Sequence, residues 1–332
     1  MNKPFTFRIG MLLPDFNVTA AFGFIDPFRA ANYLRGSGLY SWDFISLNSQ
    51  PVVASNSARI ETEVTLAEKK TYDMIVVNSS WAPERFETSE LKKWLGNHLR
   101  NGATLAGIDT GAFVLAAAGL MHRSRATVHY EHCAAFKELY PACVLEEVLY
   151  VIDGDRLTCS GGAASTDLAL RLVQIQHGLE LANASAVYLF KGRHRAGNEP
   201  QVEHDREPVG YSMPAKLREA IVLMERNVEE PLSPAEIAAT LSISQRQLQR
   251  LFKRSTGVTP VRYGINVRLN RARGLVTQTD MSVAEIASAC GFGATEQFSR
   301  SYSAHFGVSP SLDRIEGRVP FQFRAYPTHI SA

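Results

Sequence analysis

Along residues 6 to 190, short continuous apolar runs alternate with longer stretches in which apolar positions recur at helical spacing. Phe7 to Leu13 and Met74 to Asn78 are apolar runs of strand length, whereas Ala20 to Arg35 carries its apolar residues on one helical face. Strands that are apolar throughout are buried on both faces, and their alternation with helices is typical of a parallel sheet covered by helices on both sides. The pattern therefore predicts an α/β domain with a doubly wound parallel sheet. The other elements that it predicts are strands at 42–47, 103–107, 149–152 and 157–160 and helices at 91–101, 111–119, 131–139, 164–178 and 180–190.

In the last third of the chain the pattern changes to helices alone, and it contains two helix-turn-helix motifs. The first spans Pro231 to Lys253 and the second spans Met281 to Phe306. Ser233 and Ser282 stand at the expected helix starts, each with a Glu three residues later, which is the spacing of a capping box. A helical segment from Val261 to Thr277 joins the motifs. Such a pair is suited to placing two helices in the major groove of DNA.

The polar faces of these helices carry side chains that can read bases. Arg bonds guanine and Gln bonds adenine bidentately, while other Arg side chains contact phosphates. A solvated charged face on an ordinary helical domain is the alternative, and the presence of two motifs argues against it. The expected DNA contacts are Gln245, Arg246, Gln249, Arg250, Thr295, Glu296 and Arg300, with Arg268 and Arg271 of the joining helix on phosphates.

Residues 217 to 313 resemble the AraC-type DNA-binding domain. The resemblance implies base contacts by Arg246, Gln249 and Arg250 from the first reading helix and by Thr295, Glu296 and Arg300 from the second. One departure follows Ser309-Pro310, where the family has an aromatic residue and an Arg and this chain has Leu312-Asp313-Arg314. The motifs that carry the match are Leu248–Lys253, Thr256-Gly257, Pro260, Arg268-Leu269, Arg271-Ala272, Ile286-Ala287, Cys290–Phe292, Phe298–Arg300 and Phe306–Pro310.

Length and charge agree with a two-domain chain. At 332 residues the expectation is two domains, and the net charge of +2 is unevenly placed. Residues 211–332 carry 15 Lys and Arg against 10 Asp and Glu, a net of +5, whereas residues 1–210 carry 20 against 23, a net of −3. The basic part coincides with the helix-turn-helix motifs. We expect a domain over 1–194, a linker over 195–213 rich in Gly and Pro, a DNA-binding domain over 214–316 and a tail over 317–332.

Four cysteines are dispersed without metal-ligand spacing, so we expect reduced thiols, no metal and no cofactor. No apolar run reaches the length of a membrane span, and no signal peptide is expected at the start. These features favour a cytoplasmic protein without a membrane partner.

The segment Leu105 to Leu115 reads as a strand, a tight turn and a helix, with Asp109 at the elbow. A residue there projects over the carboxyl edge of the sheet, where open α/β sheets bind ligands. The adjacent helix N-terminus is expected to favour the ionised form of Asp109.

Residues 6 to 190 resemble the PfpI-like branch of the class I glutamine amidotransferase-like fold, a flavodoxin-like architecture. The motifs are this elbow, residues 126–129 and residues 159–162. The resemblance implies a catalytic Cys at the elbow, where this chain has Asp109, and a Glu where it has Ala20, while His129 is kept. Cys159 ends another strand, but no base is evident near it, so we expect no catalytic residue.

A non-catalytic pocket joined to a DNA-binding module resembles the GlxA-type AraC regulators, and residues 126–132 and 151–159 resemble regulators of choline, betaine and carnitine breakdown. This implies a transcriptional regulator, expected to be an activator, that binds a small effector. A quaternary amine suits the charge of Asp109 and the aromatic rings; arginine or another amino acid is an alternative, and each ring or His129 could instead serve packing. The expected ligand contacts are Phe16, Asn78, Ser79, Trp81, Asp109, Thr110, His129, Tyr130 and Glu131.

Other expected partners are operator DNA, RNA polymerase and a second copy of the chain, which forms a homodimer. An amidase or hydrolase with a DNA-binding domain is the alternative function, and an architectural DNA binder without a ligand is a weaker one.

Overall fold

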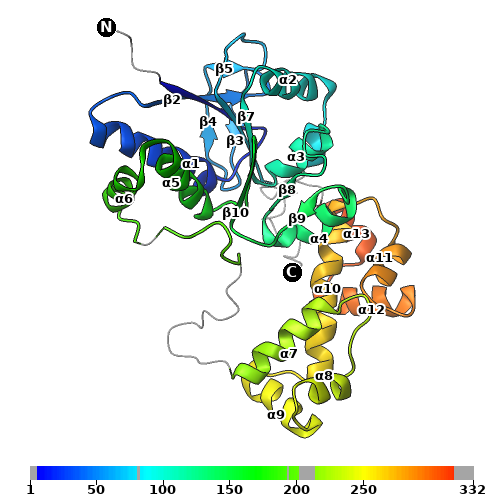
Figure 1. The fold of residues 1–332 in the computed structure, drawn as a ribbon. Coiled ribbons are helices and arrows are strands. Elements are labelled where there is room, and N and C mark those ends of the chain that lie inside the picture. The colour runs from blue at the N-terminus through cyan, green and yellow to red at the C-terminus, as the bar shows by residue number, and fades with distance from the viewer. Residues whose placement is uncertain (1–5, 81–82, 193, 202–213, 318–332) are drawn as a thin grey trace, which may run out of the picture. The chain divides into compact units, whose positions relative to one another are not determined.

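The computed structural model describes residues 6–80, 83–192, 194–201 and 214–317, which fall into two compact units on either side of the Gln201–Val202 bond. The first unit is built on a seven-stranded sheet in the order β10-β11-β7-β6-β1-β2-β5 (Figure 1). All neighbouring strands are parallel except the edge strand β10, which runs antiparallel to β11. The strands are β1 Phe7–Leu12, β2 Tyr40–Ser46, β5 Val64–Thr65, β6 Met74–Ser79, β7 Thr104–Asp109, β10 Tyr150–Asp153 and β11 Arg156–Cys159.

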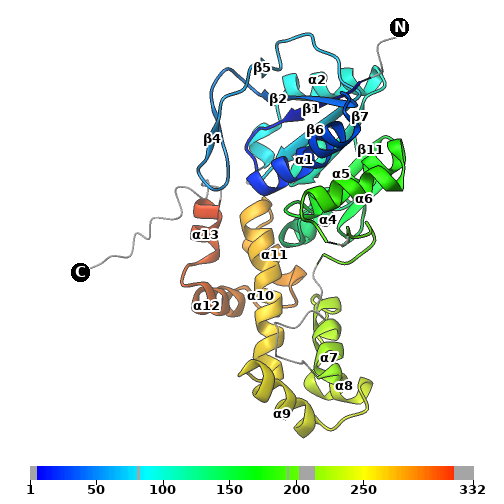
Figure 2. The same ribbon diagram turned by 90° about the vertical axis from the view of Figure 1, so that its left-hand side faces the viewer.

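Helices cover both faces of this sheet, as the apolar pattern predicts. On one face lie α1, α5 and α6, which contact one another (Figures 1 and 2). The hydrophobic core on this side includes Phe24 and Phe28 of α1 and Leu168 of α5. On the other face lie α2, α3 and α4, around Leu95, Phe113 and other apolar side chains. The helices are α1 Val18–Arg35, α2 Ser89–Arg100, α3 Gly111–Ala117, α4 Cys133–Leu139, α5 Ala164–His177 and α6 Leu179–Tyr188.

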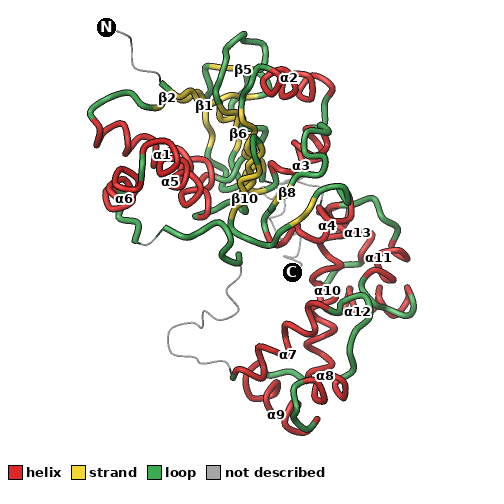
Figure 3. The backbone as a smooth tube through the Cα atoms, viewed as in Figure 1, coloured by secondary structure: helices red, strands yellow, loops and turns green. Residues whose placement is uncertain are grey.

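Small elements complete the first unit (Figure 3). Two short 3-10 turns, η1 Pro83–Phe86 and η2 Tyr130–His132, precede α2 and α4, so the helix expected over 131–139 begins as a 3-10 turn. The two-stranded sheets pair β3 Val52–Val53 with β4 Arg59–Ile60 and β8 Arg125–Ala126 with β9 Val144–Leu145.

The second unit consists of helices in its described part, and its two helix-turn-helix motifs lie where the sequence predicts them. Ser233, Ser244 and Ser282 each form a capping box that satisfies backbone amides at a helix start. Gly291 lies between α11 and α12 at φ +69, where a Cβ atom would come within 2.6 Å of the Val228 carbonyl oxygen, so only glycine fits. The helices are α7 Ala215–Arg226, α8 Pro234–Thr240, α9 Gln245–Thr256, α10 Pro260–Gln278, α11 Val283–Ala289, α12 Thr295–Phe306 and α13 Pro310–Gly317.

Candidate functional site

The elbow at the end of β7 has the geometry that the sequence predicts. Asp109 adopts φ +62, a left-handed conformation that a non-glycine residue rarely holds, and it lies opposite Ser79 at the carboxyl end of β6. The turn is tightly packed on both sides. A Cβ atom on Gly111 would lie 2.0 Å from the Val77 carbonyl oxygen, and one on Gly161 would lie 3.0 Å from the Asp109 Cβ atom. The Asp109 side chain is therefore fixed in place, with 5% of its surface exposed.

Asn17 holds this carboxyl group and also begins helix α1. Its Nδ2 donates to Asp109 Oδ2 at 3.3 Å, while its Oδ1 accepts the Ala20 amide at 3.2 Å. Asn78 Nδ2 donates in turn to the Asn17 carbonyl oxygen at 3.2 Å. Asn78 Oδ1 is buried without a hydrogen-bond partner among the described residues. Sequence reasoning did not single out Asn17, although an Asn directly before a helical stretch is a recognisable N-cap.

Burial, more than the helix end, sets the charge of Asp109. Desolvation raises the pKa of its carboxyl group from 3.8 to about 8; the Asn17 hydrogen bond lowers it, and the nearby carboxylates Asp15 and Glu131 raise it further. Burial therefore works against the expectation that the helix N-terminus keeps Asp109 ionised in the free protein at neutral pH.

The remaining polar residues of the β6 end are engaged with protein groups. Ser79 Oγ donates to Asp15 Oδ1 at 2.9 Å, and the Ser80 amide donates to the same oxygen at 2.9 Å. Thr110 Oγ1 donates to the Ser80 carbonyl oxygen at 3.2 Å and is fully buried. These contacts position the loop that carries Asp15 beside Asp109.

Of the two aromatic residues expected near the β1 and β6 ends, the structure describes only Phe16. Phe16 is fully buried in the core below α1, and its backbone bridges Ala54. The structure thus corrects the expectation that Phe16 contacts a ligand: its ring packs on apolar neighbours. Trp81 lies outside the described residues.

His129, Tyr130 and Glu131 form the side of the site that comes from the loop before α4. His129 Nδ1 accepts the Glu131 amide at 3.4 Å, and its ring lies 4.5 Å from the Tyr130 ring between centroids. Burial lowers the pKa of His129, and the Glu131 carboxylate partly opposes this shift. Tyr130 keeps 51% of its surface exposed. The loop therefore offers a neutral imidazole, an open aromatic ring and a carboxylate whose charge acts on Asp109.

Two of the three thiols of the first unit, those of Cys159 and Cys133, are unsuited to nucleophilic chemistry. Cys159 is fully buried, its Sγ lies 3.9 Å from Ser165 Oγ, and burial raises its pKa to about 12. Burial raises the pKa of Cys133 to about 12 as well. The thiolate is the reactive form, so both groups are inert at neutral pH. Within the described ranges, no cluster of three or more His, Cys, Asp or Glu side chains could hold a metal ion.

In the second unit, α9 exposes the polar face that the sequence predicts. Leu248 and Phe252 are fully buried. The opposite face leaves the expected base-reading side chains exposed to solvent, namely Gln245, Arg246, Gln249 and Arg250.

On α12, Phe298 and Tyr302 point inward, Thr295 is half-buried, and Glu296 and Arg300 are exposed. Arg300 Nε donates back to the Glu296 carbonyl oxygen at 3.4 Å. Both motifs thus present a polar helix face.

The two arginines expected on phosphates are both engaged with other groups of the second unit. Arg268 Nη1 donates to the Gly291 carbonyl oxygen at 2.7 Å, and its guanidinium lies 4.5 Å from the centre of the Phe292 ring. Burial lowers the pKa of Arg268. Arg271 pairs with Glu229 at 3.2 Å. The structure thus corrects the assignment of Arg268 to a phosphate contact, because its hydrogen bond and ring contact brace the turn between α11 and α12. Arg271 is engaged as well, in its ion pair with Glu229 at the surface.

The departure at the end of the AraC-like region has a structural role. Asp313, on α13, is 3% exposed and accepts from Arg273 Nε at 2.9 Å and from the Tyr302 hydroxyl at 2.6 Å. A buried carboxylate with two donors fixes α13 against α10 and α12.

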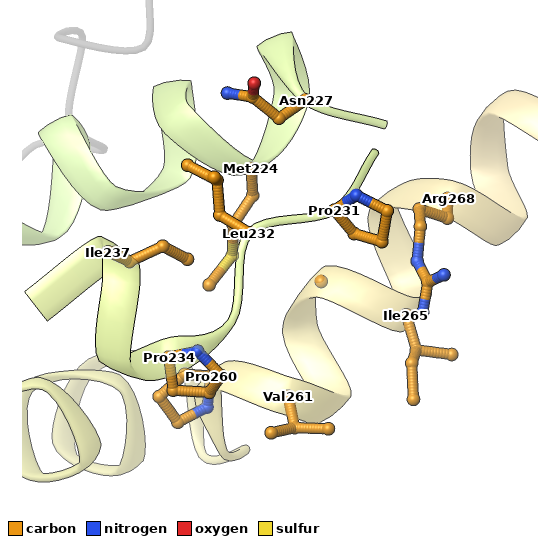
Figure 4. A pocket seen from close by; sticks show the side chains of 11 residues that line it. Met224, Asn227, Pro231, Leu232, Pro234, Ile237, Pro260, Val261, Ile265 and Arg268 are labelled. Carbon is orange, nitrogen blue, oxygen red and sulfur yellow. The ribbon is translucent and has the colours of Figure 1, made fainter. Parts of the chain in front are cut away.

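A pocket of about 190 Å³ lies in the second unit between α7, α8 and α10 (Figure 4). Its lining is mainly apolar, with Met224, Leu232, Ile237 and Ile265, and the guanidinium of Arg268 at one end is already bound to Gly291. None of the residues expected to bind an effector lines it.

No helix in the described residues combines the length and the apolar character that crossing a membrane requires.

Known protein families match both units of the chain. Residues 16–175 match the DJ-1/PfpI family, and residues 237–314 match a helix-turn-helix domain family. The chain also shares its fold with a ThiJ/PfpI family protein from Pseudomonas syringae, at a TM-score of 0.51 and 18% identity, over 72% of this chain and 91% of that one.

Two curated relatives span both units. The HTH-type transcriptional regulator CdhR of Pseudomonas aeruginosa is 40% identical over 317 residues, covering 95% of this chain and 92% of the relative. The HTH-type transcriptional regulator GbdR of the same species is 37% identical over 309 residues, covering 92% and 83%. The chain belongs to the AraC-type transcriptional regulators that carry a DJ-1/PfpI domain before their helix-turn-helix domain.

Proposed function

We propose that this regulator is controlled by a small metabolite with a cationic group, which binds beside Asp109 in a non-catalytic first unit. The observation that carries the proposal is the buried, strained carboxyl group at the elbow. The groups that act on its charge are Asn17, Asp15 and Glu131, none of which is cationic. A ligand cation would supply the missing positive charge and favour the ionised form of Asp109.

A quaternary ammonium group fits the rest of the site. Its methyl groups cannot donate strong hydrogen bonds, so they are recognised by ring faces and by nearby negative charge. Tyr130 offers an exposed ring beside Glu131, and His129 is held neutral by burial. The resemblance to regulators of choline, betaine and carnitine breakdown points to the same class; L-arginine is the second candidate, because a guanidinium would pair with the same carboxylates.

Calorimetric titration of the full chain with glycine betaine, L-carnitine and L-arginine tests this proposal. We expect one of them to bind, and we expect Asp109→Asn to weaken it at least tenfold, which is about 1.4 kcal/mol. Asp155→Asn is the matched control, because Asp155 is exposed and pairs with Arg156 at the far end of β11. Equal binding by the wild type and Asp109→Asn would remove Asp109 from the site.

The hydrolase alternative lacks a thiol nucleophile at the elbow. The elbow carries Asp109 in place of Cys, Ala20 stands where the family's enzymes have Glu, and the thiols of Cys159 and Cys133 are protonated. Amide or glyoxal turnover by the purified chain, retained in Asp109→Ala, would contradict this account of the elbow.

DNA recognition is assigned to the exposed faces of α9 and α12. Each lost bidentate base contact costs about 1–3 kcal/mol of specific binding, so Arg250→Ala and Arg300→Ala should each weaken operator binding by that amount. Arg254→Ala is the control, since this residue is exposed one turn further along α9. If both variants bound the operator as tightly as the wild type does, the assignment of these base contacts would be refuted. We expect binding to activate transcription through RNA polymerase.

A homodimer through the first unit is the assembly we propose. Helices α1 and α6 expose Tyr33 and Val187, at 69% and 74%, and the Tyr33 ring lies 5.2 Å from that of Tyr188. Phe190 beside them is 99% exposed at φ +52. An apolar face of this kind marks an interaction surface. Sedimentation at micromolar concentration should show a dimer that Val187→Glu dissociates; a monomeric wild type would contradict it.

A further inference from the structure

The first seven residues of the expected linker, Arg195 to Gln201, are part of the first unit. We call them the latch segment. The Leu149 amide donates to the Glu199 carbonyl oxygen at 2.9 Å, and the Tyr150 amide donates to that of Gly197 at 3.2 Å. Val148 and Pro200 form an antiparallel bridge. The segment therefore pairs with the first residue of β10 and with the two residues before it, whose backbone groups would otherwise be left unpaired.

One end of the latch segment is firmly anchored. Asp167 on α5 is fully buried, and it accepts from the Arg195 amide at 2.9 Å and from the Arg195 guanidinium at 2.8 and 2.9 Å. Lys191 pairs with the same carboxylate at 3.1 Å. A buried carboxylate needs such partners, so this end is costly to release.

The other end is held more weakly and adjoins the candidate ligand site. Gln201 Nε2 donates to Thr127 Oγ1 at 2.9 Å and to the Val128 carbonyl oxygen at 2.7 Å. Gln201 Oε1 is buried and finds no hydrogen-bond partner among the described residues, which reduces the gain from closing this end. Val128 directly precedes His129, so the peptide that accepts the Gln201 bond also carries His129.

We propose that the latch segment couples occupancy of the site at His129, Tyr130 and Glu131 to the chain that leads into α7, with Gln201 as the coupling residue. This inference rests on the proposed ligand site. A ligand that settles against Glu131 shifts the His129 peptide and withdraws the Val128 carbonyl oxygen from Gln201. The end of the latch segment then opens, while Asp167 keeps its start in place.

Opening of the latch segment lengthens the stretch of chain that connects the two units. With the latch closed, residues 202–214 separate Gln201 from the start of α7 at Ala215. With it open as far as Arg195, the connection also includes residues 196–201, so six residues are added. The distance that a chain segment can span grows with its length, so an open latch widens the set of positions that the DNA-binding unit can reach.

Hydrogen exchange of the full chain tests the coupling, with the Leu149 and Tyr150 amides as reporters. Saturating glycine betaine should speed their exchange at least fivefold. Because coupling is reciprocal, Gln201→Ala and Gln201→Glu should tighten betaine binding by a similar factor. Gln50→Ala is the control, since Gln50 is exposed in a loop and should change neither quantity. Unchanged exchange with bound betaine, together with unchanged affinity in both Gln201 variants, overturns the latch.

Two Gly→Ala substitutions test the backbone pairing of the latch segment without removing any polar side chain. A Cβ atom on Gly197 would lie 2.7 Å from the Tyr150 carbonyl oxygen, whereas one on Gly192 meets no atom within 4 Å. Gly197→Ala should therefore open the latch and speed Tyr150 exchange at least tenfold, while Gly192→Ala should leave it unchanged. Equal exchange in the two variants would count against the pairing itself.

A third comparison separates the latch from the identity of the ligand. Without any small molecule, His129→Ala should change Leu149 and Tyr150 exchange at least threefold, and the exposed His122→Ala should not. If betaine fails to bind but His129→Ala has this effect, the ligand class is wrong and the coupling stands. If neither betaine nor His129→Ala alters exchange, the coupling is refuted.

Discussion

Replacing Asp109 by Asn should stabilise the first unit at neutral pH and remove part of its pH dependence. The folded carboxyl group has a pKa of about 8 against an ordinary value of 3.8. Between these values the folded state holds a proton that the unfolded state has lost, so unfolding becomes more favourable as pH rises. The slope from this one group is at most about 1.4 kcal/mol per pH unit, so between pH 5.5 and 7.5 it amounts to a few kcal/mol. Above pH 8 both states are ionised and the slope ends.

Asn suits the position in two ways. It is isosteric with Asp, and it tolerates the left-handed φ of +62 better than most residues. The assay is urea unfolding of the full chain followed by tryptophan fluorescence. The three tryptophans of the chain, Trp42, Trp81 and Trp94, all precede residue 202, so the signal reports on the first unit alone.

The difference in unfolding free energy between Asp109→Asn and the wild type isolates Asp109, since every other titrating group is common to both. That difference should grow in favour of the variant from pH 5.5 to pH 7.5 and level off above pH 8. Asp155→Asn should follow the wild-type curve with a constant offset. A difference that stays constant from pH 5.5 to pH 7.5 would mean that the fold does not raise the pKa of Asp109, and the burial argument would be wrong.

Three further outcomes follow from the site and the second unit. Binding of glycine betaine at pH 7 should release close to one proton from Asp109, which calorimetry detects as a heat that depends on the buffer. Because only ionised Asp109 pairs with a cation, the affinity for betaine should rise up to tenfold per pH unit below pH 8. An affinity that does not depend on pH would contradict this. Arg268→Ala should lower the midpoint of far-ultraviolet circular dichroism melting, and it should leave the salt dependence of DNA binding unchanged, because its guanidinium braces Gly291; a flatter salt slope would restore a phosphate contact. Iodoacetamide should leave Cys159 unmodified over hours at pH 7 in the folded chain, as mass spectrometry of its peptide would show; rapid alkylation would mean that its thiolate is accessible.

The second unit was predictable because its signals are local. A capping box, a buried apolar stripe and a turn each involve residues a few positions apart, so Ser233 or Ser282 identifies its helix without knowledge of the fold. Arg268 shows the limit of prediction from local signals. Its charge and helical position suggest phosphate binding, but its partner Gly291 is 23 residues away and is brought to it only by packing.

The elbow was predictable in shape but not in charge. The strand, turn and helix around Asp109 are written in consecutive residues, and the strained φ follows from the tight turn. The protonation state depends instead on burial and on Asn17, Asp15 and Glu131, which come from two segments far apart in the sequence, the loop before α1 and the turn before α4.

The latch segment shows the same limit in the backbone. Gly197 and Pro200 are typical of a linker, and that composition led to a boundary at residue 195. Composition reports on what a segment can do alone, whereas the edge of β10 and the buried Asp167 decide what it does in the fold. A polar segment beside an unpaired strand edge gains hydrogen bonds that it lacks in isolation. Because these bonds end at Val128, next to His129, the segment read as a passive connection is placed to respond to the ligand site.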